Sequence, residues 1–317
     1  MIDKQLQAGL HGDFETACNI GIDLELERPA CHRSAFNRGW YKLMDGDFKG
    51  GFADMERGRI EGIFGNPKPQ TPMARWGGEN LNGETVLLHG EGGIGDQIIN
   101  ARFTKEIVKK GGRAVMSVSP ELMGLMGQQC LADAIVSQES TGNVYHDLWL
   151  PAMSAPYVTG IDYDSLDGST YLTAPQRYID KHSKYKDLIG ARFYGNPEFE
   201  HEQYRVFPQE LMTHALHGHK WASLQKEDNP DIQCWEDTAG IIANLKLVVT
   251  SCTAVAHLSA AMGKPTWVIV PLLPYYIWAL PGDTSPWYDS VRLFRQTTFN
   301  DWTEPFRELN EALQCMN

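Results

Sequence analysis

A glycine-rich loop followed by an aspartate contains the first residues in this chain that could do chemistry. The loop, here called the glycine loop, spans residues 90–96, follows a short apolar run and opens an amphipathic stretch. Glycines let a ligand approach the backbone closely, and a carboxylate at the rim of such a turn can act as a general base. Asp96 is therefore a candidate base, although an aspartate that begins a helix also interacts favourably with the helix dipole.

A second loop, residues 250–257, combines hydroxyl side chains with a helix start and is called the hydroxyl loop. Ser251 and Thr253 are good N-cap residues, and the N–H groups at a helix start form a ready anion site. Simple capping would explain the hydroxyls equally well. His257 follows on a mostly apolar helix, where a hydrogen-bonded packing histidine is the simpler interpretation.

The glycine loop also matches the G-x-G-x-x-G fingerprint of dinucleotide-binding proteins. That fingerprint needs an acidic residue at the end of the next strand to bind the ribose. Here the next predicted strand, 113–118, is followed by Ser119, and Glu121 lies beyond Pro120. The match is incomplete, so a nicotinamide-dependent oxidoreductase is a less favoured alternative.

Strands alternating with helices position both loops. Apolar β-rich runs predict strands at 85–89, 113–118, 134–136, 188–194, 221–224, 247–250, 266–270 and 291–294. Helical periodicity predicts helices at 96–110, 122–126, 208–217, 235–244, 253–262 and 304–313, with a less regular segment at 143–186. This order predicts an α/β protein with two doubly wound domains facing each other, each with ligand sites at the carboxyl ends of its strands.

The N-terminal quarter has a different, helical pattern. Gly-Asp-Phe at residues 12–14 recurs at 46–48, an offset of 34 residues that is typical of tetratricopeptide repeats. Gly39 stands where such a repeat needs a small residue for close helix crossing. We predict a tetratricopeptide-like helical segment at 1–65 and a linker at 66–83. Two Rossmann-like domains follow at 84–185 and 186–317.

The amino-acid composition and the net charge exclude several classes of protein. The 317 residues are 42% apolar and 21% charged, which is ordinary for a globular protein and excludes a disordered one. A net charge of −12 argues against nucleic acid as a partner. We expect no signal peptide and no transmembrane segment. The six scattered cysteines fit the reducing cytoplasm, and neither they nor His214, His217 and His219 predict a metal site.

Several motifs in a constant order resemble one family. They are the run from Pro72 to Gln97, residues 195–197, 205–208, 223–225 and 237–239, and most strongly 253–265 and 285–296. Together they resemble the tetratricopeptide-repeat glycosyltransferases of bacteria and phages. These are related to the lipopolysaccharide heptosyltransferases of glycosyltransferase family 9. The resemblance extends from Ala35 to the C-terminus.

The resemblance implies a GT-B fold and transfer of a sugar from a nucleoside diphosphate to a hydroxyl acceptor. The acceptor would be a glycan, a protein or a small molecule. Transfer would invert the anomeric centre and need neither a metal nor a tightly bound cofactor. Asp96 would be the base, with Gly92, Gly93 and Gly95 on the acceptor side. The implied donor-binding residues are Asn196, Arg205, Gln225, Ser251, Cys252, Thr253, Ala254 and His257, and Arg205 would bind phosphate unless it only forms a surface salt bridge.

Cys252 departs from the family pattern, in which many members have an aspartate that approaches the donor sugar. The departure leaves the sugar open and supports an alternative, a catalytically silent, repeat-containing binding protein on a GT-B scaffold. A helix N-terminus lowers a thiol pKa, but no histidine is placed beside Cys252 by the sequence, which disfavours a cysteine nucleophile. The aromatic run 275–278 could stack on a ligand or cover the core.

Overall fold

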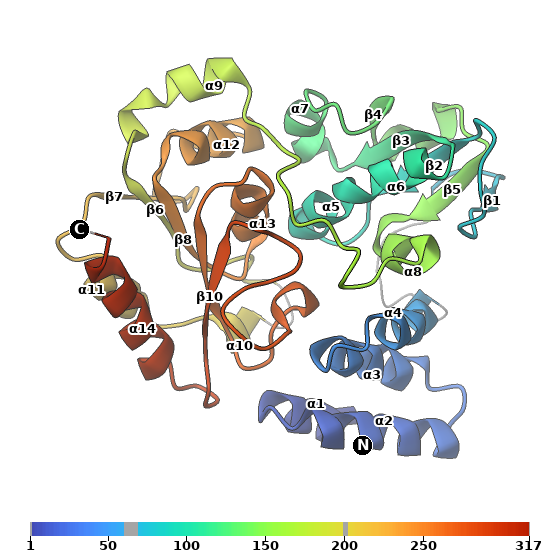
Figure 1. The fold of residues 1–317 in the computed structure, drawn as a ribbon, viewed down its shortest axis with the longest axis horizontal. Coiled ribbons are helices and arrows are strands. Elements are labelled where there is room, and N and C mark those ends of the chain that lie inside the picture. Colours follow the sequence, from blue (N-terminus) through green and yellow to red (C-terminus); the bar gives the residue numbers. More distant parts are fainter. Residues whose placement is uncertain (1, 60–68, 199–201, 317) are drawn as a thin grey trace.

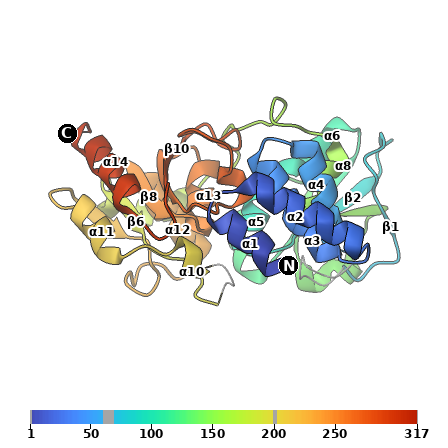
Figure 2. The same cartoon turned by 90° about the horizontal axis from the view of Figure 1, so that it is seen from below.

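The chain folds into a helical segment and two α/β lobes, shown in Figure 1 for a computed structural model that describes residues 2–59, 69–198 and 202–316. We call residues 2–59 the helical segment, 69–160 the N-terminal lobe and 176–316 the C-terminal lobe. Residues 161–175 join the two lobes. In Figure 2, seen from below, the helical segment lies across the lobes, with α4 against α8 of one lobe and α3 against residues 276–278 of the other.

The helical segment consists of two helix hairpins followed by a 3-10 turn. The helices are α1 (Ile2–Leu10), α2 (Phe14–Glu27), α3 (His32–Met44) and α4 (Phe48–Glu56). Both turns use the repeated tripeptide in the same way. Gly12 and Gly46 have positive φ values of 74° and 87°, and the carboxylates of Asp13 and Asp47 cap α2 and α4. The two turns therefore share one backbone conformation and one kind of cap, and glycine is needed because only glycine adopts this backbone without strain.

Gly39 lets α3 and α4 cross closely, as the sequence predicts. A Cβ at Gly39 would lie 2.5 Å from the carbonyl oxygen of Gly51 and 2.8 Å from the backbone nitrogen of Met55. Any side chain at this position would therefore push the two backbones apart. The assignment of the pair of hairpins to the tetratricopeptide class stays a prediction.

The N-terminal lobe is a five-stranded parallel sheet with strand order β1-β5-β2-β3-β4. Its strands are β1 (Ala74–Arg75), β2 (Thr85–His89), β3 (Arg113–Val118), β4 (Ala134–Ser137) and β5 (Leu148–Pro151), and its helices are α5 (Ile94–Asn100), α6 (Thr104–Lys109), α7 (Met123–Met126) and α8 (Ala155–Thr159). A 3-10 turn, Ala101–Phe103, divides the single helix expected at 96–110.

Two strands of this lobe differ from the sequence expectation. β5 lies in the segment read as irregular, yet it pairs with β2 inside the sheet. β1 lies in the expected linker and extends the sheet edge through β5. Both strands are short and are stabilised by parallel pairing with distant residues. No periodicity in the local sequence therefore predicts them. The start of the expected linker, residues 66–68, lies outside the described residues.

The C-terminal lobe repeats the architecture, with strand order β10-β9-β8-β6-β7 and parallel pairing throughout. Its strands are β6 (Ile189–Arg192), β7 (Trp221–Ser223), β8 (Leu247–Ser251), β9 (Thr266–Val270) and β10 (Val291–Arg295). Its helices are α9 (Gln176–Lys181), α10 (Glu202–Arg205), α11 (Gln209–Ala215), α12 (Trp235–Asn244), α13 (Ala254–Ala261) and α14 (Thr303–Gln314). The two doubly wound sheets predicted from the sequence are thus confirmed.

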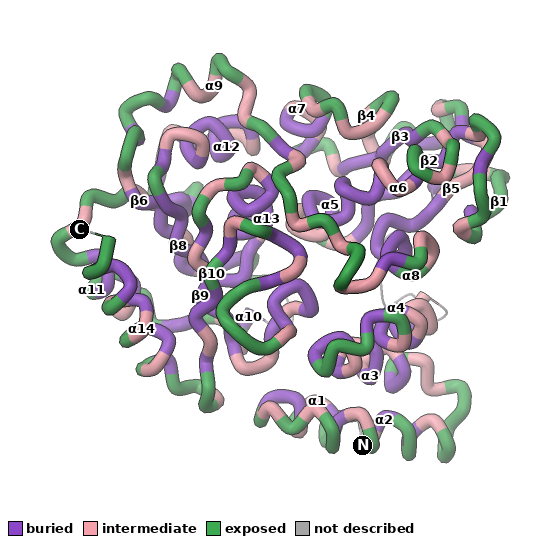
Figure 3. The backbone as a smooth tube through the Cα atoms, viewed as in Figure 1, coloured by how far each residue is buried: buried purple, intermediate pink, exposed green. Residues whose placement is uncertain are grey.

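A continuous apolar core joins the three parts. It runs from Phe52 of α4 through Ile98 of α5 to Leu258 of α13, and Figure 3 shows α5 and α13 as largely buried. The contact between α5 and α13 brings the glycine loop and the hydroxyl loop to the same junction. No helix in the described ranges is both long and apolar enough to span a membrane.

Candidate active site

A cavity of about 750 Å³ lies between the two lobes. One wall is the glycine loop, from Gly93 to Asp96, together with Glu121. The opposite wall is formed by the ends of β6, β7 and β8 and by the first residues of α12 and α13. Both walls are therefore built at the carboxyl ends of parallel strands, where open α/β sheets bind their ligands.

The glycine loop turns directly from β2 into α5 and places Asp96 in the first turn of that helix. Gly92 has a φ of 67°, and the Gly93 N–H donates to Asp96 Oδ2 over 2.8 Å. Gly95 packs against the other lobe, since a Cβ there would lie 3.1 Å from His257 Cδ2. Gly93 and Gly95 line the cavity, whereas Gly92 is not among its lining residues and shapes the turn.

The carboxylate of Asp96 is bonded across the cleft. The hydroxyl of Tyr275, from the C-terminal lobe, donates a short hydrogen bond to Asp96 Oδ1. Burial raises the pKa of Asp96 above that of an ordinary aspartate, against the hydrogen bonds from Tyr275 and Gly93 and the charge of Arg205, which lower it. A carboxylate whose pKa is raised by burial holds a proton more tightly, which suits a general base.

The hydroxyl loop lines the cavity at the start of α13 without a side-chain cap. Thr253 is the N-cap of α13, but its side chain makes no capping hydrogen bond and instead lies 3.3 Å from the hydroxyl of Thr250. Thr253 and Ala254 line the cavity. Capping therefore does not account for the hydroxyl side chains. Ser251 is buried and does not line the cavity, so its predicted place on the donor is not supported.

Three cations lie on the C-terminal wall. Arg205 pairs with buried Glu202, and its Nη1 donates to the Cys252 carbonyl over 2.5 Å. Arg205 thus forms a largely buried salt bridge and also lines the cavity, while its predicted contact with phosphate stays a prediction. Sequence reasoning missed Arg192 and Lys226, which also line the cavity. Arg192 ends β6, so its place at a strand terminus is the signal that could have found it. Burial lowers the pKa of Arg192.

Cys252 and His257 are both uncharged. Burial raises the pKa of Cys252 to about 12, and its thiol donates to the Ile269 carbonyl over 3.4 Å. Burial, with the charges of Arg102 and Arg205, lowers the pKa of His257 to about 3. The His257 ring stacks on Trp278 with centroids 5.0 Å apart. A neutral thiol is a poor nucleophile, and His257 is a packing histidine whose edge reaches the cavity.

The structure places two further predicted donor-binding residues, Asn196 and Gln225, differently. Asn196 lines the cavity. Gln225 is completely buried and accepts a hydrogen bond from the Phe193 N–H, so it supports the wall from behind and its predicted donor contact is not supported. In the aromatic run, Tyr275 lines the cavity, whereas Tyr276 and Trp278 are buried in the core.

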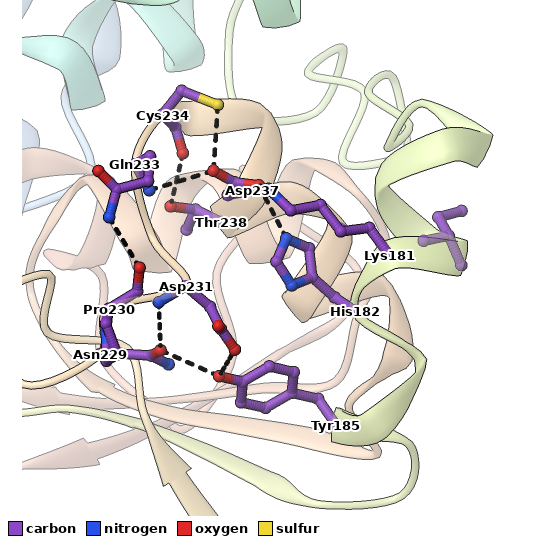
Figure 4. Close-up of polar contacts among 12 residues, drawn as sticks. Lys181, His182, Tyr185, Asn229, Pro230, Asp231, Gln233, Cys234, Asp237 and Thr238 are labelled. Carbon is purple, nitrogen blue, oxygen red and sulfur yellow. Dashed lines mark hydrogen bonds and ion pairs between the residues drawn. The ribbon is translucent and has the colours of Figure 1, made fainter.

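A polar network holds the cavity wall beside α12 (Figure 4). Asp237 accepts hydrogen bonds from Lys181, His182 and the Gln233 N–H. Burial acts to raise the pKa of Asp237, but these hydrogen bonds outweigh it and hold the pKa well below the usual range. The residues around Asp237 that line the cavity are Gln233, Cys234, Trp235 and Thr238. The motif at 237–239 thus positions the wall.

The charges of the two walls differ. On the N-terminal half, the charged residues that line the cavity, Asp96 and Glu121, are both acidic. At the strand ends of this half, Ser119 donates to Gln97, and the Gln138 amide donates to the Gly90 carbonyl. His214 and His217 are exposed, and no group of three metal-ligating side chains is found in the described parts of the chain.

The similarity of this chain to known proteins lies in its fold. No protein-family model and no curated protein matches the sequence. The structure is similar to the glycosyl transferase family 9 protein from Veillonella parvula, with a TM-score of 0.53, 9% identity and coverage of 75% of this chain and 91% of that chain. It is also similar to the E. coli ADP-heptose lps heptosyltransferase II, with a TM-score of 0.50, 12% identity and coverage of 74% and 100%.

At these identities the likeness concerns architecture. The two parallel sheets of this chain, with the helices that flank them, match the folds of both neighbours. The chain therefore has the GT-B fold of the family 9 glycosyltransferases, preceded by a helical segment.

Proposed function

We propose that this protein is a glycosyltransferase that moves a sugar from a nucleoside-diphosphate sugar to an acceptor hydroxyl. The observation that carries the proposal is the division of chemistry between the walls of one cavity. A carboxylate with a raised pKa, Asp96, lies on the N-terminal wall. The opposite wall combines a helix start with Arg192, Arg205 and Lys226.

The C-terminal wall suits the diphosphate of the donor. The start of α13 favours negative charge, and the side chains of Arg192, Arg205 and Lys226 add positive charge. These groups would stabilise the charge that develops on the leaving diphosphate. The nucleoside would then lie toward the part of the wall formed by Ile232 and Trp235.

Asp96 would act on the acceptor. It takes the proton of the acceptor hydroxyl while the oxygen bonds to the anomeric carbon. The bond from that carbon to the phosphate oxygen breaks, and its electron pair leaves with the diphosphate. A single displacement of this kind inverts the anomeric centre. The neutral thiol of Cys252 gives no support to a covalent intermediate.

The charge of the N-terminal wall bears on the acceptor. Its strand ends carry hydroxyl and amide groups and the carboxylate of Glu121. Arg59, which approaches the glycine loop, is paired with Glu91. A phosphorylated acceptor would meet like charge here, whereas neutral sugar hydroxyls would find donors and acceptors. We therefore propose a neutral acceptor.

Nucleotide binding followed by turnover tests the function. We expect one of UDP, GDP, ADP, CDP or dTDP at millimolar concentration to raise the melting temperature, because a ligand bound only to the folded state stabilises it. Asp96→Asn should keep this shift and lose release of nucleotide from the matching nucleotide-sugar. Asp164→Asn, an exposed aspartate in residues 161–175, is the matched control and should keep both.

The outcomes separate the alternatives. No shift with any nucleotide contradicts the proposed donor site. A shift without turnover by the unmodified protein favours a catalytically silent binding protein on this scaffold. Full turnover by Asp96→Asn removes Asp96 as the base.

A further inference from the structure

The helical segment reaches the cleft through Trp40. The Trp40 ring meets the rings of Tyr275 and Tyr276 edge-on, with centroids 5.1 and 5.4 Å away, and its indole N–H donates to the Pro274 carbonyl over 3.2 Å. Tyr275 is the residue whose hydroxyl donates to Asp96. Trp40 thus packs directly behind the hydrogen-bond partner of the proposed base.

The same segment holds the other end of the glycine loop through Arg59. The Arg59 guanidinium makes two hydrogen bonds, of 2.5 and 2.7 Å, to the carboxylate of Glu91. Its Nε also donates to the Ser154 hydroxyl over 2.7 Å. Glu91 is only 4% exposed and belongs to the loop that ends at Asp96. A paired, forked contact of this kind constrains both position and orientation.

The two repeated turns lie against the stretch that carries Tyr275. A Cβ at Gly12 would lie 3.6 Å from Leu272, and one at Gly46 would lie 3.8 Å from Leu280. Ala17, Tyr41 and Met44 form an apolar cluster with Ala279 of the same stretch. Both hairpins of the helical segment therefore pack on residues 272–280.

We propose that the helical segment is a built-in part of the catalytic centre, in which Trp40 and Arg59 are positioning residues for Asp96. Trp40 acts through Tyr275 and holds the carboxylate from the C-terminal side. Arg59 acts through Glu91 and holds the glycine loop from the N-terminal side. The catalytic part of this inference rests on the proposed function. A displacement of about 1 Å in a reacting group can cost about 100-fold in rate. The contacts made by Trp40 and Arg59 would therefore affect the rate of transfer.

Hydrogen exchange and kinetics on the full chain test the inference. The variants are Trp40→Ala, Trp40→Phe, Arg59→Gln and Arg59→Lys, and Arg292→Gln is the control. Arg292 is an exposed arginine of the C-terminal lobe that pairs with Asp283. Circular dichroism and the melting temperature report whether each variant is folded. If Trp40→Ala or Arg59→Gln does not fold, Trp40→Phe and Arg59→Lys serve in its place.

We expect faster amide exchange in peptides covering 90–100 for the Trp40 and Arg59 variants and no change for the control. With the nucleotide-sugar that the protein accepts, kcat should fall about 10- to 100-fold for Trp40→Ala and Arg59→Gln, with the nucleotide Kd unchanged. Trp40→Phe should recover part of the loss because it keeps the ring contact. Arg59→Lys should recover less, since an ammonium cannot make the forked contact.

Unchanged exchange at 90–100 together with unchanged kcat would overturn the inference. A change in nucleotide Kd alone would overturn it too, because it would place the effect on the donor wall. If the unmodified protein turns over no nucleotide-sugar, the proposed function fails. The exchange measurement then decides by itself whether the helical segment holds the loop.

Discussion

At the scale of single residues, the environment of Asp96 decides its chemistry. An aspartate in water is ionised near neutral pH and a weak base. Here burial raises the pKa of Asp96, while the Tyr275 hydroxyl and the Gly93 N–H stabilise the charged form. Carboxylate oxygens can accept about four hydrogen bonds in total, so these two contacts leave room for an acceptor hydroxyl.

Tyr275→Phe should shift the pH dependence of transfer. The base must be ionised, so the rate falls as the pH is lowered through the pKa of Asp96. The Tyr275 hydrogen bond lowers that pKa, and its removal therefore raises the pKa further. The acidic limb of the kcat profile should therefore move to higher pH.

The control for this profile is Tyr145→Phe, which removes the hydroxyl of an exposed tyrosine bonded to Asp147. Its profile should match that of the unmodified protein. A limb that stays in place in Tyr275→Phe, or moves to lower pH, would show that Tyr275 does not stabilise the ionised base.

At the scale of elements, turn chemistry and close packing build the helical segment. The Gly-Asp-Phe turns succeed because glycine supplies a positive φ and the next carboxylate caps the following helix. The crossing of α3 on α4 depends on the missing side chain of Gly39. These are local rules, which act within a few residues of each turn.

Gly39→Ala should destabilise the protein by about 1–3 kcal/mol, the usual range for overpacking. The added methyl group would meet the backbone of α4 at 2.5 Å, and backbone atoms cannot move aside as a flexible side chain can. Urea unfolding measures the change. Gly142→Ala is the control, because its Cβ would find ordinary contacts of 3.4 Å or more. Equal midpoints for the two variants would contradict the close crossing.

At the scale of the whole molecule, the two lobes divide the charge of the cleft. The cations that face the cavity come from the C-terminal lobe, while the charged residues that line the N-terminal wall, Asp96 and Glu121, are acidic. The net charge of −12 therefore does not prevent a diphosphate site. Its effect falls on the acceptor side, where no compensating cations line the wall among the described residues.

Transfer should accordingly favour neutral acceptors. With matched acceptors such as a methyl glycoside and its 6-phosphate, we expect a higher kcat/KM for the neutral compound. Glu121→Lys should reduce this discrimination about 10-fold by placing a cation on the acceptor wall. Initial rates of nucleotide release measure both. Equal or greater use of the phosphorylated compound would contradict the neutral-acceptor proposal.

The sequence by itself determined the alternation of strands and helices, both loops and the two doubly wound domains, because periodicity and turn residues act over a few neighbours, while the GT-B architecture was implied by the family resemblance. Only the tertiary structure decided what those loops face. Tyr275 reaches Asp96 from 179 residues away, and Gln225 and Ser251 lie behind the wall that their positions in the sequence suggested they would line. The tertiary structure also decided that β5 pairs with β2 and that Arg192 and Lys226 line the cavity. Long-range packing of two sheets sets which side of a loop is exposed, and no local pattern carries that information.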